Sequence, residues 1–380
     1  MKINNLSDMV AFFDEILYKN HDRFQKEKLN ATNQLKSYIV ENHIHTHKKD
    51  MSDLIVEFFH NLNKDLKKCD FKITQTQDEN LYINESAHGK IFIDTSNNRF
   101  WKIHSVAKAE ISDYFHQTLL KKRNLDQIWL PIPFLLGLKK YGNTYGMGIS
   151  FTEHLKKDEL DDKLFENQDT LNINIRRLYV DEMLKLLNNS PLRSVMGINK
   201  ISLIDPSNED GEESYIIDDI TYYGKITGRG TSFTKHNYML YNILKNYEKQ
   251  ILHIEKQYSF DFEEHTHTIK GFPIEINFNR PDIDLQKLVK ILFSGKKPFH
   301  LWGIPDWKNE NFCKITAIDL HNGNYANSID FEITNKLLRA FLPQGACGNS
   351  IARLLTNIHQ SIDATSVMEG VHGDEFFSII

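Results

Sequence analysis

The chain has 380 residues, which is long enough to bury a sizeable core and to form two or three domains. Its 24 Phe and 15 Tyr, with hydrophobic residues at 40%, exclude a chain that is disordered over most of its length. The formal net charge of -5 excludes a global positive field, so contact with nucleic acid or anionic lipid would require a local basic patch.

The N-terminus and the cysteines indicate a cytoplasmic protein. Residues 1–7 lack the apolar core of a secretory signal, and the longest mostly apolar run, 129–138, is far shorter than the roughly 20 residues of a membrane helix. The 3 Cys residues lack CxxC spacing and support neither a disulfide framework nor a cysteine zinc site. We expect no membrane partner, and the Asn-, Lys- and Ile-rich composition suits an AT-rich bacterial or phage genome.

The first seventy residues predict helices. Ser7 can cap a helix, Ser52 can cap another, and a weaker helix is expected from Arg23 to Val40. The apolar positions that repeat with a helical period are Met9, Phe13 and Leu17 in the first helix and Ile55, Phe59 and Leu62 in the one after Ser52.

From Phe71 the apolar period changes to alternation, which predicts an antiparallel sheet followed by a helix over 108–123. The expected strands are 71–73, 81–83, 91–93, 100–103 and 147–151, and the charged stretch 156–169 predicts a surface segment.

The second half predicts larger units of the same kind. Strands at 201–204 and 215–226 precede a long helix from Ser232 to Tyr258. The later expectations are a strand at 274–276, a helix at 285–293, a hairpin of 299–304 with 312–320, and helices at 331–341 and 349–362. The fold class is α+β, with an N-terminal helical segment followed by mixed antiparallel sheet and helix units. The expected regions are 1–70, 71–155 and 170–380.

A glycine-bracketed arginine between a predicted strand and the long helix is the clearest candidate binding site. Glycines let backbone N–H groups turn outward, a helix N-terminus carries partial positive charge, and Arg229 can neutralise a phosphate. Neither GxxxxGK[ST] nor GxGxxG is present. The alternative is a tight strand-to-helix connection with a solvated arginine. The candidate phosphate-binding residues are Lys225, Gly228, Arg229, Gly230, Ser232 and Lys235.

Arg353 and His359 in the last predicted helix are alternative catalytic residues. Their Arg-x5-His spelling resembles that of HEPN ribonucleases, in which Arg and His polarise phosphate and transfer protons. At ~100° per residue, this spacing places the two side chains off a common helix face. The resemblance implies a metal-independent nuclease.

Other motifs support a metal-dependent alternative. Asp306 and Lys308 match part of a metal-dependent nuclease core, and Asp218 with Asp219 could add carboxylates. The HxH motifs at 43–47 and 265–267 could meet around a divalent ion, and the first resembles a motif of metal-dependent phosphoesterases. Because exposed loops explain these clusters better, we assign no metal ligand, and the sequence names no cofactor.

Two further patterns could contribute to function. Cys347 precedes a predicted helix and His321 could act as its base, in an order that resembles caspase-like peptidases, although Gly345 replaces their glutamine. The basic and aromatic runs 99–102 and 121–123 could form a local nucleic-acid patch, or Trp101 could belong to the core.

No motif defines a reaction, so the leading hypothesis is a non-catalytic binding subunit that recognises nucleic acid or another phosphate-bearing ligand. Its expected context is a bacterial multi-protein system of the antiviral defence type. The alternatives are a nuclease and a protein–protein assembly factor, and we expect a protein partner or a homo-oligomer.

Overall fold

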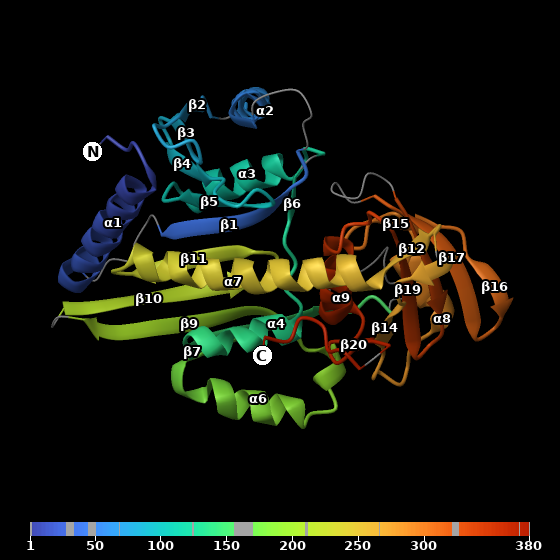
Figure 1. Cartoon of the computed structure of the whole chain (residues 1–380). Coiled ribbons are helices and arrows are strands. Elements are labelled where there is room, and N and C mark those ends of the chain that lie inside the picture. The colour runs from blue at the N-terminus through green and yellow to red at the C-terminus, as the bar shows by residue number, and fades with distance from the viewer. Residues whose placement is uncertain are drawn as a thin grey trace. The chain divides into compact units, whose positions relative to one another are not determined.

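The structure is a computed structural model that describes residues 2–27, 34–44, 51–67, 69–123, 125–155, 170–209, 212–265, 267–320, 327–371 and 373–379. It confirms the α+β class, because helices accompany two mostly antiparallel sheets (Figure 1). In the described part of the chain, no helix is both long enough and apolar enough to cross a membrane.

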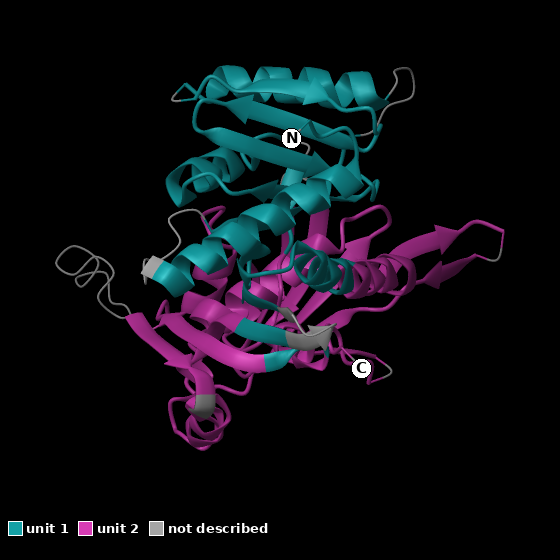
Figure 2. Cartoon of the chain, turned by 90° about the vertical axis from the view of Figure 1, so that its left-hand side faces the viewer, with its two compact units in different colours: residues 1–128, 141–143, 202–244 teal, residues 129–140, 144–201, 245–380 magenta. Residues whose placement is uncertain are grey.

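The chain forms two compact units that alternate along the sequence (Figure 2). Unit 1 contains residues 1–128, 141–143 and 202–244, and unit 2 contains residues 129–140, 144–201 and 245–380. The sequence predicts three consecutive regions instead, and whether those regions fold independently stays a prediction.

Unit 1 is built on an antiparallel sheet with β1 (Leu35–Asn42) in its interior. The predicted helix from Arg23 to Val40 is wrong over 35–40, where the chain forms this strand. All residues of β1 are buried, so the strand shows no alternation of apolar and polar residues by which it could be recognised. The order is β2 (Lys72–Gln75), β3 (Leu81–Ser86), β4 (Gly89–Asp94), β5 (Phe100–Ser105), β1, β11 (Lys225–Gly230) and β10 (Glu212–Thr221).

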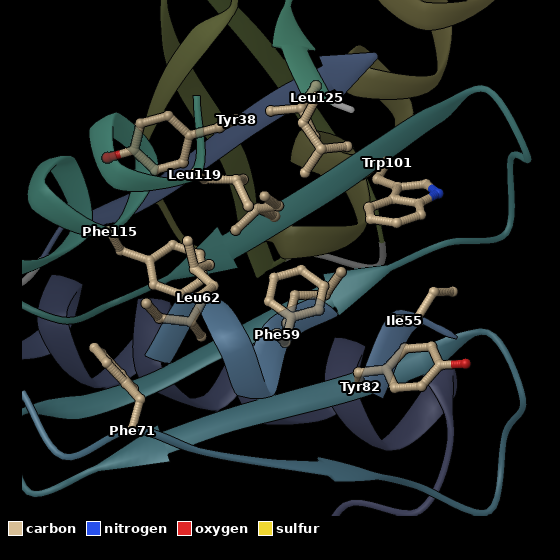
Figure 3. Packing of buried hydrophobic residues seen from close by; sticks show 14 of the residues in the cluster. Tyr38, Ile55, Phe59, Leu62, Phe71, Tyr82, Trp101, Phe115, Leu119 and Leu125 are labelled. Atoms are coloured by element: carbon tan, nitrogen blue, oxygen red, sulfur yellow. The ribbon is translucent and has the colours of Figure 1, made fainter. Parts of the chain in front are cut away.

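Two hydrophobic clusters cover β1. One contains Phe59 of α2 (Met51–Asp65) and Phe115 of α3 (Ala109–Leu119), packed with Tyr38 and Trp101 (Figure 3). The other joins α1 (Leu6–Glu27) to the start of α7 (Phe233–His253) and includes Met9, Phe13, Leu17, Leu35, Phe92 and Phe233.

The ends of several elements differ from the sequence prediction. The first helix begins at Leu6, and the Asn5 side chain accepts a hydrogen bond from the Asp8 N–H at 2.9 Å, so Ser7 is not its cap. The predicted strand 215–226 is two strands, β10 and β11, because the chain turns between them at Gly224. The long helix is confirmed, and its last turn, Ile254–Tyr258, is π-helical.

Unit 2 contains a second sheet. Its order is β13 (Thr268–Lys270), β12 (Ser259–Glu263), β19 (Leu337–Pro343), β18 (Ser328–Ile333), β17 (Phe312–Asp319) and β15 (Leu301–Gly303), with β14 (Ile274–Asn277) between β19 and β20 (Val367–Gly370) and with β16 (Asp306–Asn309) on β17. The other described α-helices of this unit are α4 (Ile132–Gly137), α6 (Val180–Asn188), α8 (Leu285–Leu292) and α9 (Asn349–Ser361), and β7 (Asn143–Thr152) pairs with β8 (Thr170–Arg176).

The predicted helix over 331–341 is wrong, because these residues belong to β18 and β19. Phe331 and Ile333 face the buried side of the sheet, as do Leu338 and Ala340, so burial follows a period of two. Thr334 closes the turn by accepting a hydrogen bond from the Leu337 N–H at 3.0 Å.

Candidate functional site

The glycine and arginine segment forms β11 and the start of α7, as the sequence predicts. Ser232 caps the helix, since its hydroxyl accepts a hydrogen bond from the Lys235 N–H at 3.3 Å. At Gly230 φ is +152°, and a Cβ atom there would lie 2.3 Å from the Tyr215 carbonyl oxygen. Glycine at this position therefore allows β10 and β11 to lie close to each other where β11 ends.

A carboxylate of the protein already occupies the N-terminus of α7. Asp14 of α1 accepts a hydrogen bond from the Phe233 N–H, and the backbone and side chain of Thr234 donate to the same carboxylate. Burial raises the pKa of Asp14 despite these hydrogen bonds. Asp14 therefore stands where the sequence analysis places a phosphate.

The basic side chains of this segment are also paired with carboxylates. Lys225 contacts both oxygens of Asp113, at 2.6 and 2.8 Å, and Arg229 contacts Asp219 at 2.8 Å. Lys235 lies 3.5 Å from Asp205. Recognition of nucleic acid or phosphate by this segment stays a prediction, and it would require a ligand to exchange with these carboxylates.

A chain of hydrogen bonds that no sequence motif predicts lies inside unit 1. The His236 Nδ1 is 2.5 Å from Asp218, its Nε2 is 2.7 Å from the Ser37 hydroxyl, and this hydroxyl is 2.7 Å from Nδ1 of His104. All four side chains belong to residues with 0% exposure. Burial lowers the pKa of His104 far below its ordinary value, and the nearby charge of Lys102 acts in the same direction, so His104 is neutral.

With His104 neutral, the contacts fit a continuous order of donors and acceptors. His104 donates to Ser37, which donates to His236, and His236 donates to Asp218. Nε2 of His104 and one carboxylate oxygen of Asp218 have no hydrogen-bond partner among the described residues. The chain therefore links four buried polar side chains through three hydrogen bonds and ends inside the protein at both sides.

Among the described residues, closely packed side chains surround this hydrogen-bonded chain and leave no path for a substrate. A Cβ atom at Gly228 would lie 3.0 Å from Nδ1 of His236 and 3.2 Å from Asp218, so glycine leaves the room that this pair needs. The stacked rings of Phe13 and Phe233, 4.6 Å apart, lie beside it. The Asp–His–Ser order matches that of a serine nucleophile, but full burial excludes substrate in this conformation.

The candidate catalytic pair Arg353 and His359 is buried in unit 2. Arg353 contacts Asp319 at 2.5 Å. The two ring nitrogens of His359 contact the Ile132 N–H at 3.3 Å and the Ser366 carbonyl at 3.0 Å. Burial lowers the pKa of His359 to about 4, so its neutral form connects these two backbone groups. Both side chains thus hold the fold together.

The remaining sequence candidates form no complete catalytic or metal site within either unit, among the described residues. Cys347 is buried before α9, whereas its proposed base, His321, lies outside the described residues. His45 and His47 also lie outside them, and Asp306 pairs with Lys308 at 2.5 Å on an exposed strand. In the two basic and aromatic runs, Trp101 is a core residue, and the side chains of Arg99, Lys102 and Lys122 pair with those of Glu41, Asp94 and Asp65.

An open groove lies over one face of the second sheet, and we call it the sheet groove. It has a volume of about 940 Å³. Phe260 and Phe341 lie 5.6 Å apart in its lining, and Trp302 is 46% exposed. Its lining residues are Phe260, Trp302, Ile304, Asp306, Lys314, Ile315, Thr316, Ile318, Ser328, Asp330, Phe331, Glu332, Phe341, Leu342 and Pro343.

Cations of the protein pair with carboxylates of the sheet groove. Its lining includes Asp306, Asp330, Glu332 and Lys314, and two cations outside the lining, Lys308 and Arg339, contact Asp306 and Glu332. Lys314 contacts Glu332 at 2.7 Å, and the Thr316 hydroxyl donates to Asp330 at 2.5 Å. Because exposed ion pairs contribute at most about 1 kcal/mol, a cation from outside can compete for these carboxylates.

These features define an α+β protein with a buried Asp–His–Ser–His chain in unit 1 and an open aromatic and acidic groove in unit 2. The chain belongs to the MJECL33-like protein family, whose model matches residues 1–377. It is 30% identical to the "Uncharacterized protein MJECL33" of Methanocaldococcus jannaschii, over 398 aligned positions that cover 93% of this chain and 92% of that relative.

Replacing Ser37 by alanine should destabilise unit 1 by about 2–4 kcal/mol, because two buried imidazoles lose a partner. Urea unfolding measures this change. Ser7→Ala is the control, since Ser7 is exposed and should tolerate alanine within about 0.5 kcal/mol. Equal stability of the two variants would contradict the hydrogen-bonded chain.

Asp14→Ala should cost about 1 kcal/mol through loss of the cap on α7. In filter binding with labelled DNA and RNA at several salt concentrations, the phosphate hypothesis predicts tighter binding by this variant. Adding Arg229→Ala should remove the gain. Unchanged binding in Asp14→Ala would argue against a phosphate site at this helix.

Acidification should destabilise the fold between pH 6.5 and about 4 through His359. The unfolded chain takes up a proton near pH 6.5, whereas the folded histidine does so only near its lowered pKa of about 4. This stability is present above pH 6.5 and is lost as pH falls, by on the order of 3 kcal/mol. Urea unfolding across this range should give a smaller pH dependence for His359→Gln, and an unchanged slope would contradict the assignment.

Proposed function

We propose that this protein is a non-catalytic binding protein that captures a basic, partly apolar polypeptide segment in the sheet groove. The observation that supports this function is the combination of the exposed Trp302 ring, the half-buried rings of Phe260 and Phe341, and three carboxylates in one open groove. Aromatic rings attract the ammonium and guanidinium groups of Lys and Arg, and carboxylates attract the same groups.

The size of the sheet groove favours a polypeptide over a small cation. Its lining extends from Phe260 on β12 across β19, β18 and β17 to Trp302 on β15. At about 4.8 Å between strands this is a span of about 19 Å, which matches about six residues of extended chain. A single small ammonium ion would leave most of the apolar lining exposed.

The other described candidates support catalysis or phosphate binding less well. The side chains of Arg353 and His359 are bonded inside the fold, and Lys225, Arg229 and Lys235 face carboxylates of the protein. A protein partner also agrees with the assembly alternative from the sequence. A role in a multi-protein defence system stays a prediction.

A fluorescent peptide of alternating Leu and Lys should bind the full-length protein, and a peptide of alternating Leu and Glu should not. Fluorescence anisotropy measures both. Trp302→Ala should weaken binding of the Leu-Lys peptide at least about tenfold, because an exposed aromatic anchor is lost. Asp330→Asn should weaken it less and should reduce its dependence on salt.

Trp307→Ala is the matched control. Trp307 is 39% exposed on the neighbouring β16 but does not line the sheet groove, so its loss should leave binding unchanged. Two results would contradict specific binding in the sheet groove. One is equal affinity for the two peptides, and the other is an equal loss of affinity in the two tryptophan variants.

A further inference from the structure

A second cavity lies at one end of the hydrophobic cluster of unit 1, and we call it the Trp101 pocket. Its volume is about 300 Å³, at the small end of the range for small-molecule sites. It is lined by Asn42, Met51, Ser52, Ile55, Gln75, Glu79, Asn80, Tyr82, Thr95, Asn98 and Trp101. This pocket is independent of the sheet groove, because all of its residues belong to unit 1.

Trp101 gives the pocket an unused hydrogen-bond donor. Trp101 is 1% exposed, and its ring packs against Phe59. Its indole N–H has no hydrogen-bond partner among the described residues. Figure 3 shows the indole nitrogen and the Tyr82 hydroxyl at the same edge of the cluster, with Ile55 between them, whereas the Tyr38 hydroxyl points to the opposite side. An indole N–H at the wall of a pocket can donate to an acceptor oxygen of a ligand.

The rest of the lining offers acceptors and further donors. The side chains of Gln75, Asn80 and Asn98 and the carboxylate of Glu79 also make no hydrogen bond with the described residues. Each carboxamide can donate two hydrogen bonds and accept two, and a carboxylate only accepts. A matching ligand must therefore both donate and accept at several points, as vicinal hydroxyl groups do.

The charge of the lining narrows the class of ligand. Among the described residues, the lining contains one carboxylate, that of Glu79, and no Lys, Arg or His. A phosphate or carboxylate group would meet repulsion from Glu79, and no cation of the described lining would compensate it. The apolar groups of Ile55, Tyr82 and Trp101 provide a surface for the C–H face of a ring.

We propose that the Trp101 pocket binds a neutral polyhydroxylated molecule of monosaccharide size. Trp101 donates to one ligand oxygen, Glu79 accepts from a hydroxyl group, and Asn80, Asn98 and Gln75 complete the polar contacts.

The test is a titration of ¹⁵N-labelled full-length protein, followed on its tryptophan indole N–H signals by nuclear magnetic resonance. The chain has 4 Trp, and Trp101→Phe identifies the signal of Trp101 by its loss. The probes are glucose, galactose, mannose, ribose and uridine, with ribose 5-phosphate for comparison. At least one neutral probe should shift the Trp101 signal in a saturable manner, and ribose 5-phosphate should bind more weakly than ribose.

Two variants separate binding in the pocket from other effects. Glu79→Ala should weaken binding of the active probe at least about tenfold, the loss expected when a hydroxyl loses a charged acceptor. Gln77→Ala is the control, since Gln77 is an exposed neighbour that does not line the pocket. No saturable shift with any neutral probe, tighter binding of ribose 5-phosphate, or binding that survives Glu79→Ala would each overturn the proposal.

Discussion

The complete burial of β1 is the constraint on which the rest of unit 1 depends. Every residue from Leu35 to Asn42 is buried, so each polar side chain on this strand needs a partner inside the protein. Lys36 donates to the backbone carbonyls of Gln34 and Ala107, both at 2.8 Å, and burial lowers its pKa to about 8. Burial would raise the pKa of Glu41, but hydrogen bonds and charge from His43 and Arg99 lower it to about 2. With Ser37 and its two histidines, these contacts bind β1 to the elements around it and disfavour any shift in strand register.

The need to satisfy polar groups inside the protein also explains the pairing of the cationic residues. In the sequence these residues indicate a ligand, but in the structure each contacts a carboxylate of the protein. Lys225 and Arg229 extend from a strand whose neighbours supply Asp113 and Asp219, and Asp14 satisfies the N-terminus of α7. A helix N-terminus and a cation each favour an anion, but a carboxylate held by the fold is always present at high effective concentration. An external phosphate must compete with it. Sequence motifs for anion binding therefore cannot distinguish a ligand site from an internal cap.

Much of the architecture was accessible from the sequence, because local periodicity reflects one-sided burial. The long α7 helix and the hairpins of β3, β4 and β5 show such patterns. β1 could not be recognised, since burial on both faces removes alternation. β18 and β19 were mistaken for a helix because Phe331, Leu338 and Phe341 recur at spacings that a helix also satisfies.

The polar chain of unit 1 depends on contacts that no local pattern records. Ser37 and His236 are 199 positions apart, and Asp14 and Phe233 are 219 apart. The sequence marks Asp218 as a possible metal ligand and Ser232 as part of a possible phosphate site, but no pattern marks Ser37, His104 or Asp14. Such long-range pairs become visible only when the fold assembles them, because the residue types involved are common everywhere in the chain.

Function is best sought where the fold leaves hydrogen bonds and apolar surface unused. The buried chain around Ser37 uses most of its donors and acceptors internally, as do Arg353 and His359 in unit 2. The Trp101 pocket differs, since Gln75, Asn80, Asn98 and Glu79 in its lining make no side-chain hydrogen bond with the described residues. The sheet groove differs through its apolar surface, where Trp302 is 46% exposed. An unused polar group beside apolar surface gains free energy when a complementary ligand arrives, whereas a satisfied group must first lose a bond. This difference, rather than resemblance to any motif, distinguishes the two recognition surfaces from the polar networks that hold each unit together.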